Sequence, residues 1–502
     1  MNTKGKIGLF WQPLGGNNVD QISGHCYLYT DCVHNSSSIL RTSVLIDIGK
    51  YDNYSGLGVS GAVAAIPDVR NFLNSEEDDV QAVFITHSHP DHLNGLAHYL
   101  KLGYKFPTIY MSPYTKIIFD ELFFEMDIPL SAYPKIEEIR GGQKVQVGSM
   151  EIEAVWVSHT CFDALGYLIT TPNACVFHSG DFKADNSTYF RSPTNFKRLN
   201  DFKGKVDCAV LDFCWAMEDG FTPKESDTFK KIISIIKKSG KSKIFLPVYP
   251  THPEMYIIAF LAALKLKKNI IFYGIKDFYI YLNLIKMYGI SFADLTKGRI
   301  KVFAHPDFAS EEDTKNGYIV IGTYNHIGDE FSFSAKDSYA IITATTYFNP
   351  LKGQLNLRGI KFVTPLEEPN LQGYGHGFLG DIEKLWQTLG KPCLVPTHCP
   401  SYVVDDFKKI MVDLGFELPQ KTPLNGDIFQ ISKGKCQKIG GEVANWLAIN
   451  YNNPQNQITA VSQKMTSGSG FLRRTISRKK TQRKFKMIAH QRKKKVEADA
   501  KV

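Results

Sequence analysis

The chain has 502 residues, 43% of them hydrophobic and 22% charged, which is typical of a globular protein and too long for one ordinary core. The formal net charge of +9 comes from the end of the chain, because 14 Lys and Arg residues follow Ser462 against two acidic residues, and the preceding body is slightly acidic. We expect a cytoplasmic protein without a structural zinc or a membrane span, because we find no secretory signal, no long apolar run and no C-x-x-C pair among the nine cysteines.

The first part of the chain leads to a cluster of metal-binding residue types. Residues 6–50 predict short strands, and residues 60–80 are expected to be helical. The stretch QAVFITHSHPDHLNG, residues 81–95, then follows an apolar, β-prone run with four donors in six positions: His87, His89, Asp91 and His92. Imidazole and carboxylate groups are the usual ligands of zinc, manganese and iron. In an extended loop the first two histidines point the same way and can bind one ion, and the other two donors can reach a second ion.

Further donors stand at the ends of three later strands. His159, Asp181 and His398 each follow a short apolar, β-prone run, and Gly180 permits a tight turn before the aspartate. One loop cannot close the coordination of two ions, so these strand ends are candidate ligands. His178 is expected to be structural, because its side chain should alternate away from the face of the aspartate.

The second half of the chain changes in periodicity. Residues 222–345 read as regular βαβ units, which predicts a parallel α/β domain. His252, His305 and His326 stand alone there and are expected to be surface or satisfied histidines. From residue 441 the composition becomes polar and then basic, which predicts a flexible linker and tail. The candidate phosphate contacts in that tail are Arg473, Arg474, Arg478, Lys479 and Lys480.

The H-x-H-x-D-H pattern and the later strand-end donors resemble the metallo-β-lactamase superfamily. The α/β insert resembles that of the β-CASP ribonuclease J-like family, whose motifs A, B and C match Asp212, His376 and His398. This resemblance implies an α/β fold, an αββα sandwich with an inserted parallel α/β β-CASP domain. The domains expected from it are residues 1–221 (sandwich, first part), 222–345 (insert), 346–440 (sandwich, C-terminal part) and 441–502 (linker and basic tail).

The resemblance also implies a site with two divalent metal ions, zinc or alternatively manganese. It assigns His87, His89 and His159 to one ion, Asp91, His92 and His398 to the other, and Asp181 to both. Asp47, at a strand end, is expected to support the metal loop (residues 81–95) without binding a metal ion itself.

The implied activity is a ribonuclease that hydrolyses RNA phosphodiester bonds with metal-activated water, with Asp91, Asp212 and His376 as the candidate catalytic residues. Tyr374 and Phe378 stand near the motif B histidine, where ribonuclease J typically has serines, and their rings are candidate RNA-stacking groups or simply fill space.

Two other functions fit parts of the pattern. A metallo-hydrolase of small esters, thioesters or lactones would share the metal loop, although the insert and the motif A and B residues count against it. A non-catalytic RNA-binding relative would share the fold, although the full ligand set counts against it. The expected partner is RNA rather than a membrane, and the sequence leaves homo-oligomerisation and the choice between exo- and endonuclease activity open.

Overall fold

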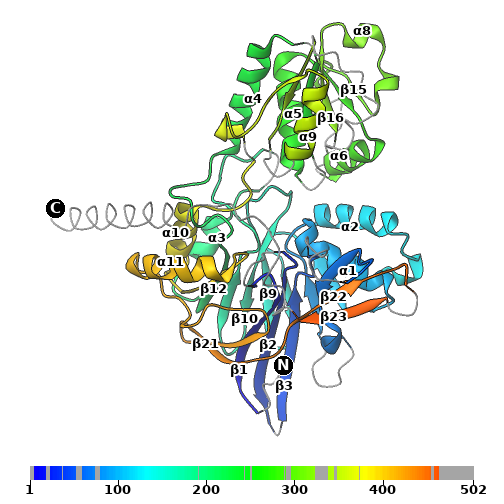
Figure 1. Cartoon of the computed structure of the whole chain (residues 1–502). Coiled ribbons are helices and arrows are strands. Elements are labelled where there is room, and N and C mark those ends of the chain that lie inside the picture. Colours follow the sequence, from blue (N-terminus) through cyan, green and yellow to red (C-terminus); the bar gives the residue numbers. More distant parts are fainter. Residues whose placement is uncertain are drawn as a thin grey trace, which may run out of the picture.

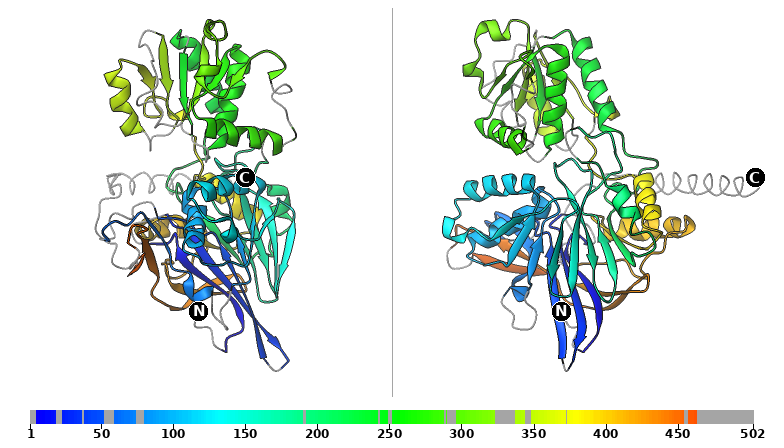
Figure 2. Two further views of the ribbon diagram at one scale, coloured as in Figure 1. Left: turned by 90° about the vertical axis from the view of Figure 1, so that its right-hand side faces the viewer. Right: turned by 180° about the vertical axis from the view of Figure 1, so that it is seen from behind.

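Two β-sheets lie face to face in the computed structural model, and a third sheet with its helices forms a second lobe (Figures 1 and 2). The structure describes residues 5–18, 23–36, 38–51, 59–73, 80–189, 192–241, 243–248, 252–287, 289, 296–322, 337–343, 348–371, 373–453 and 457–462. None of the helices in these ranges combines the length and the apolarity needed to cross a membrane.

The first sheet has eight strands in the order β21–β20–β1–β2–β3–β5–β6–β7. Their bounds are β1 (Gly8–Gly15), β2 (Cys26–Asn35), β3 (Ser38–Ile46), β5 (Ala82–Phe84), β6 (Thr108–Met111), β7 (Ile136–Glu138), β20 (Asp427–Ser432) and β21 (Lys435–Gly441). The second sheet has six strands in the order β19–β12–β11–β10–β9–β8. Their bounds are β8 (Lys144–Val147), β9 (Met150–Trp156), β10 (Leu165–Thr170), β11 (Cys175–His178), β12 (Cys208–Asp212) and β19 (Cys393–Thr397).

Alternating apolar side chains bury both faces of these sheets. In β5, Phe84 packs between the sheets against the core that includes Tyr167, whereas Val83 points to the opposite face. Helices α1 (Pro90–Lys101) and α2 (Pro113–Glu125) cover the outer face of the first sheet. Helices α3 (Phe196–Asn200), α10 (Leu379–Thr388) and α11 (Ser401–Asp413) cover that of the second (Figure 1). The predicted αββα sandwich is confirmed.

The insert is built on an all-parallel sheet in the order β15–β14–β16–β13–β17–β18. Its strands are β13 (Lys243–Pro247), β14 (Asn269–Phe272), β15 (Val302–Phe303), β16 (Tyr318–Gly322), β17 (Ser338–Ile341) and β18 (Lys361–Val363). Its helices are α4 (Glu225–Ser239), α5 (Pro253–Leu266), α6 (Ile275–Met287), α8 (Glu311–Thr314) and α9 (Phe348–Leu357). The sheet therefore continues past the expected boundary at residue 345, because α9 is the crossover that brings the short strand β18 beside β17.

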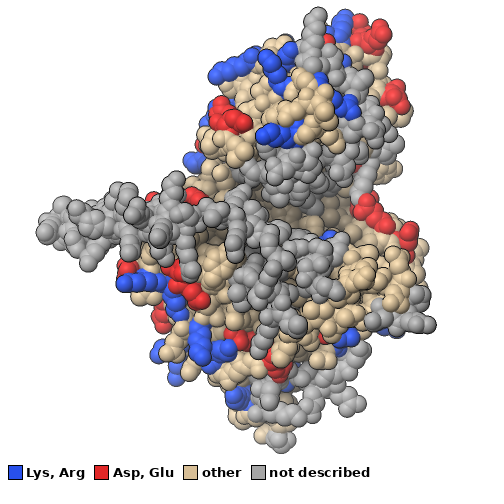
Figure 3. Space-filling view, in the orientation of Figure 1, with Lys and Arg blue, Asp and Glu red and all other residues tan. Residues whose placement is uncertain are grey.

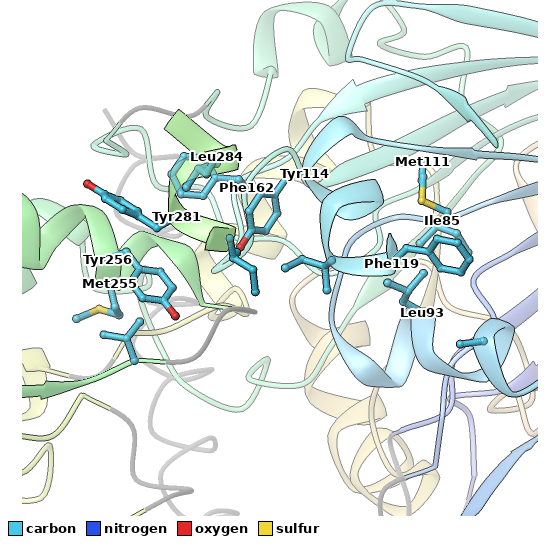
Figure 4. Close-up of a cluster of buried hydrophobic side chains, with 14 of the residues drawn as sticks. Ile85, Leu93, Met111, Tyr114, Phe119, Phe162, Met255, Tyr256, Tyr281 and Leu284 are labelled. Atoms are coloured by element: carbon cyan, nitrogen blue, oxygen red, sulfur yellow. The ribbon is translucent and has the colours of Figure 1, made fainter. Parts of the chain in front are cut away.

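The insert packs on the sandwich through one continuous buried cluster. Figure 4 shows Tyr114 of α2 and Phe162 facing Tyr281 and Leu284 of α6, with Tyr256 of α5 close by. The rings of Tyr114 and Phe162 lie 5.7 Å apart, and all of these side chains are buried. This contact holds the start of α5 above the sandwich.

A small fourth sheet corrects two sequence predictions. Strands β22 (Asn445–Ile449) and β23 (Ile458–Ser462) pair with β4 (Ala64–Pro67), so the linker does not begin at residue 441. Residues 60–80 were expected to be helical, but within the part that the structure describes they contain β4 and the short 3₁₀ helix η2 (Arg70–Phe72). Both errors have a related cause, since the strands are short and the pairing of β4 with β22 joins segments that are distant in sequence. The five predicted tail residues from Arg473 to Lys480 lie outside the described residues.

Trp446 holds this three-stranded sheet against the sandwich. Its side chain is fully buried and stacks on Tyr51 at a centroid distance of 4.8 Å. We expect Trp446→Ala to lower the free energy of unfolding by about 3–5 kcal/mol, because the change leaves a large cavity. Val443→Ala is the control, since Val443 is 59% exposed and should shift stability by less than about 0.5 kcal/mol. Urea unfolding of both variants checks this, and equal stabilities would contradict a buttressing role for the tryptophan.

Candidate metal centre

The metal loop, residues 81–95, runs from β5 into the first turn of α1, which carries Asp91 and His92, and Asp47 is hydrogen-bonded to it. The carboxylate of Asp47 accepts hydrogen bonds from the backbone N–H of Thr86 at 2.8 Å and from Nδ1 of His92 at 2.8 Å. Asp47 itself has a φ of 62°, a left-handed conformation that aspartate tolerates better than most residues. Because Nδ1 of His92 is fixed in this way, its Nε2 faces the opposite side, where the other candidate ligands gather.

Three of the predicted histidines meet around one side of Asp181. Nε2 of His159 lies 3.0 Å from Nδ1 of His89 and 3.6 Å from Oδ2 of Asp181. Nε2 of His87 lies 3.5 Å from the same carboxylate oxygen. The other ring nitrogen of His159 is 2.7 Å from the carbonyl oxygen of Gly375, which fixes the orientation of the ring. A Cβ atom on that glycine would lie 2.6 Å from the His159 ring, so a side chain there would displace it.

The remaining predicted ligands meet on the other side of Asp181. Nε2 of His92 lies 3.4 Å from Oδ2 of Asp181, so this oxygen stands between the two groups of histidines. Oδ2 of Asp91 lies 3.9 Å from Nε2 of His92 and 3.7 Å from Nε2 of His398. His398 has a φ of 54°, and strained backbone of this kind is frequent at functional sites. The structure thus brings all seven predicted ligands together.

The donor set fits divalent cations. Within the described part of the chain, Nε2 of His87, Nε2 of His92 and Oδ2 of Asp181 are buried and have no hydrogen-bond partner. Leaving such atoms unsatisfied costs about 1–3 kcal/mol each, and a shared cation removes that cost. Burial, reinforced by neighbouring histidines, also holds the pKa values of His87, His89 and His159 well below the usual range. These rings are therefore neutral, which is the form that binds metal.

Asp212 and His376 form a separate pair beside this cluster. Nδ1 of His376 lies 2.8 Å from Oδ2 of Asp212 and 3.7 Å from Oδ2 of Asp181. Burial alone would lower the pKa of His376, but the carboxylates of Asp212 and Asp181 outweigh burial and raise it to about 9. The imidazole is therefore positively charged at neutral pH and can stabilise negative charge or donate a proton.

Three aromatic rings adjoin the His376 segment. The rings of Tyr374 and Phe378 are 5.2 Å apart, and both contact Trp215 at centroid distances of 5.7 and 6.4 Å. All three side chains are partly exposed. The two predicted stacking residues are thus joined by a tryptophan from the segment after β12, where Asp212 ends the strand.

Four other histidines bear on the sequence predictions. His178 is 3.0 Å from the hydroxyl of Tyr29 in the core between the sheets, which agrees with its predicted structural role. His252 was expected to stand apart, but its ring lies 4.9 Å from that of His89 because the start of α5 is held over the metal loop. Burial lowers its pKa to about 4, so this ring is neutral. His305 pairs with Asp307 at 3.2 Å on the insert, and His326 lies outside the described residues.

His25 was missed entirely by the sequence reasoning. It immediately precedes β2, is buried, and lies within contact of His92 and His398 with ring centroids 4.1 and 4.2 Å apart. No motif marks it, and only its position after a glycine distinguishes it in the sequence.

The surface is hollowed where the insert meets the sandwich (Figure 3).

Comparisons with known proteins support the fold and the family resemblance. A model described as a beta-lactamase superfamily domain matches residues 62–241. The chain is 26% identical to ribonuclease J of Helicobacter pylori (strain 26695) over 276 residues, which are 55% of this chain and 37% of that protein. It is 22% identical to ribonuclease J of Sinorhizobium meliloti over 453 residues, covering 86% of this chain and 76% of that protein. The chain thus spans little more than a third of the H. pylori relative.

One solved structure shows the same fold over most of the chain. It is a protein of unknown function from Enterococcus faecalis V583, with a TM-score of 0.56 and 16% identity, covering 78% of this chain and 95% of that one. This structure shows the fold alone, and the sequence similarities confirm the predicted resemblance to the metallo-β-lactamase superfamily and its ribonuclease J-like family.

Proposed function

Because the chain has the metallo-β-lactamase fold and is similar to ribonuclease J, we propose that it is a metal-dependent ribonuclease that hydrolyses RNA phosphodiester bonds. One observation carries the proposal. Oδ2 of Asp181 lies 3.4–3.6 Å from three histidines on both sides of it, and the charged pair of His376 and Asp212 stands directly beside this cluster.

We assign His87, His89 and His159 to one divalent ion, Asp91, His92 and His398 to a second, and Asp181 to both. Histidine and carboxylate donors suit zinc, and manganese is the alternative. When bound, such ions supply an activated water and neutralise charge on the phosphate. Two hydrogen bonds to groups that are not ligands orient the donors: Nδ1 of His92 bonds to Asp47, and Nδ1 of His159 bonds to the Gly375 carbonyl.

His376 and Asp212 act on the RNA rather than on the metal in this proposal. Asp212 accepts the Nδ1 hydrogen of His376, which orients the ring and leaves Nε2–H to face a phosphate oxygen. The positive charge of the ring stabilises the charge that develops on the phosphate as the bond breaks. Trp215, Tyr374 and Phe378 offer partly exposed rings near this position, on which bases of a single strand can stack.

Hydrolysis assays with three substrates test the proposal. The purified protein is incubated with labelled RNA, single-stranded DNA and a chromogenic ester, each with and without a chelator. We expect cleavage of RNA that stops on chelation, and the product lengths distinguish cleavage from an end from internal cleavage. Hydrolysis of the ester without cleavage of RNA would favour a small-ester hydrolase. Binding of RNA without hydrolysis of any substrate would favour a non-catalytic relative.

The basic tail is proposed to bind the RNA backbone. Neutralising Arg473, Arg474, Arg478, Lys479 and Lys480 with glutamine should reduce the slope of log affinity against log salt by up to about 3.5, roughly 0.7 per lost phosphate contact. Deleting residues 463–502 should reduce it further, while cleavage at saturating RNA stays close to that of the full chain, because all metal ligands are retained. RNA titrations at several salt concentrations measure this. Parallel slopes for the intact and altered proteins would show that the tail does not contact RNA.

A further inference from the structure

We infer that His25 is an additional metal ligand, which joins Asp91, His92 and His398 at the second ion. The inference rests on the proposed two-ion site and adds to it a residue that belongs to none of the motifs of the family. Four donor atoms then surround that position, besides the shared Asp181: Nε2 of His25, Oδ2 of Asp91, Nε2 of His92 and Nε2 of His398.

The backbone fixes His25 directly against the metal loop. Its N–H donates to the carbonyl of Asp91 at 2.7 Å, and its own carbonyl accepts from the N–H of Gly49 at 2.9 Å. The approach is close enough that a Cβ atom on Gly49 would lie 1.6 Å from the Asp91 carbonyl oxygen. The preceding Gly24 has a φ of 72° and would collide with Trp446 if it carried a side chain. The turn that presents His25 is therefore closely packed.

The His25 ring is oriented as a ligand would be. Its Nδ1 is 2.7 Å from the hydroxyl of Tyr27, which leaves Nε2 facing the cluster. That Nε2 lies 3.7 Å from Oδ2 of Asp91, and the ligand atoms of His25, His92 and His398 all lie within 4.8 Å of one another. Donors around a tetrahedral zinc ion are about 3.3–3.4 Å apart, since each zinc–nitrogen bond is about 2.0–2.1 Å. Oδ2 of Asp91 lies 3.7–3.9 Å from the Nε2 atoms of His25, His92 and His398, slightly more than that value.

A purely structural role leaves this ring unexplained. The side chain is buried, and its Nε2 has no hydrogen-bond partner within the described residues, like the facing Nε2 of His92. Two such nitrogens aimed at one point are unfavourable, and a cation between them satisfies both. His178 shows the contrast, because this buried histidine is hydrogen-bonded to Tyr29 and faces the core.

The consequence is an unequal pair of metal positions. The first ion has three protein donors of its own and the second has four, with Asp181 shared between them. We therefore expect the second position to fill first when metal is added, and His25 to be responsible for that order.

Zinc titration of the metal-free protein against a chromophoric chelator tests the inference without using activity. The intact chain should bind two ions. His25→Ala should weaken one of them by at least about 100-fold, beyond the 10- to 100-fold typical of residues that only support a ligand, and should leave the other unchanged. His178→Gln is the matched control, which should keep both affinities. His25→Gln, which retains more of the side-chain volume, provides the same test if the alanine variant does not fold.

The outcomes separate the two proposals. An intact chain that binds fewer than two ions would overturn the two-ion site itself. If the intact chain binds two ions and the folded His25 variants lose less than about 100-fold at either position, His25 is not a ligand and the proposed function still stands. Thermal unfolding of the metal-free variants shows whether any loss of binding is instead a loss of the fold.

Discussion

Asp181→Ala should abolish RNA cleavage, with a rate loss of more than about 1,000-fold, and should release bound metal. The reason is geometric, because Oδ2 of Asp181 lies within 3.6 Å of His87, His92 and His159, and no other described carboxylate joins both groups of histidines. Its removal should take one donor from each ion and leave the Nε2 atoms of His87, His92 and His159 without the carboxylate that lies between them. His92→Ala should act in the same direction, since its Nε2 belongs to the cluster and its Nδ1 joins the loop to Asp47.

A buried aspartate outside the cluster supplies the control for this prediction. Asp31 is fully buried in β2, where its carboxylate accepts hydrogen bonds from Ser149 and Asn173. Asp31→Asn should therefore retain metal and cleavage even if it lowers stability. Elemental analysis of each purified variant, beside its rate on labelled RNA, decides the matter. Full activity and full metal content in Asp181→Ala would contradict the shared role of this carboxylate.

His376→Ala should keep both ions and yet cleave RNA at least about 100-fold more slowly. This is the scale expected for losing a group that stabilises charge or transfers a proton. The histidine is held by Asp212 at 2.8 Å rather than by the two groups of ligands, so its removal leaves those donors complete. Single-turnover rates at saturating RNA, with the metal content of the same sample, measure the two effects separately. A variant that loses an ion would instead make His376 a ligand.

The metal loop and the sandwich could be predicted because their signals are local. His87, His89, Asp91 and His92 adjoin one another, and alternation in strands such as β5 marks two buried faces. Asp181 and His398 were identifiable because each follows an apolar strand. In the structure their strands β11 and β19 flank the parallel strand β12, so the ends of all three meet at one edge.

His25 and His252 could not be predicted because their neighbours are distant in sequence. His25 contacts His398, which lies 373 residues later in the sequence. The hydrogen bond from the His25 N–H to the Asp91 carbonyl brings it into the site. His252 approaches His89 only because α6 and α5 pack on α2 and Phe162. The strand around Trp446 was hidden for a similar reason, since its partner β4 lies more than 350 residues earlier.

The most direct test of the proposed two-ion ribonuclease is the rate of RNA cleavage as metal is returned to the metal-free protein. Zinc, and manganese in a parallel series, is added in known equivalents to metal-free protein, and cleavage of labelled RNA is followed at each step. We expect no cleavage without metal and a rate that reaches its maximum at two equivalents per chain. Cleavage that is unaffected by removing metal, or that is absent at every loading, would contradict it.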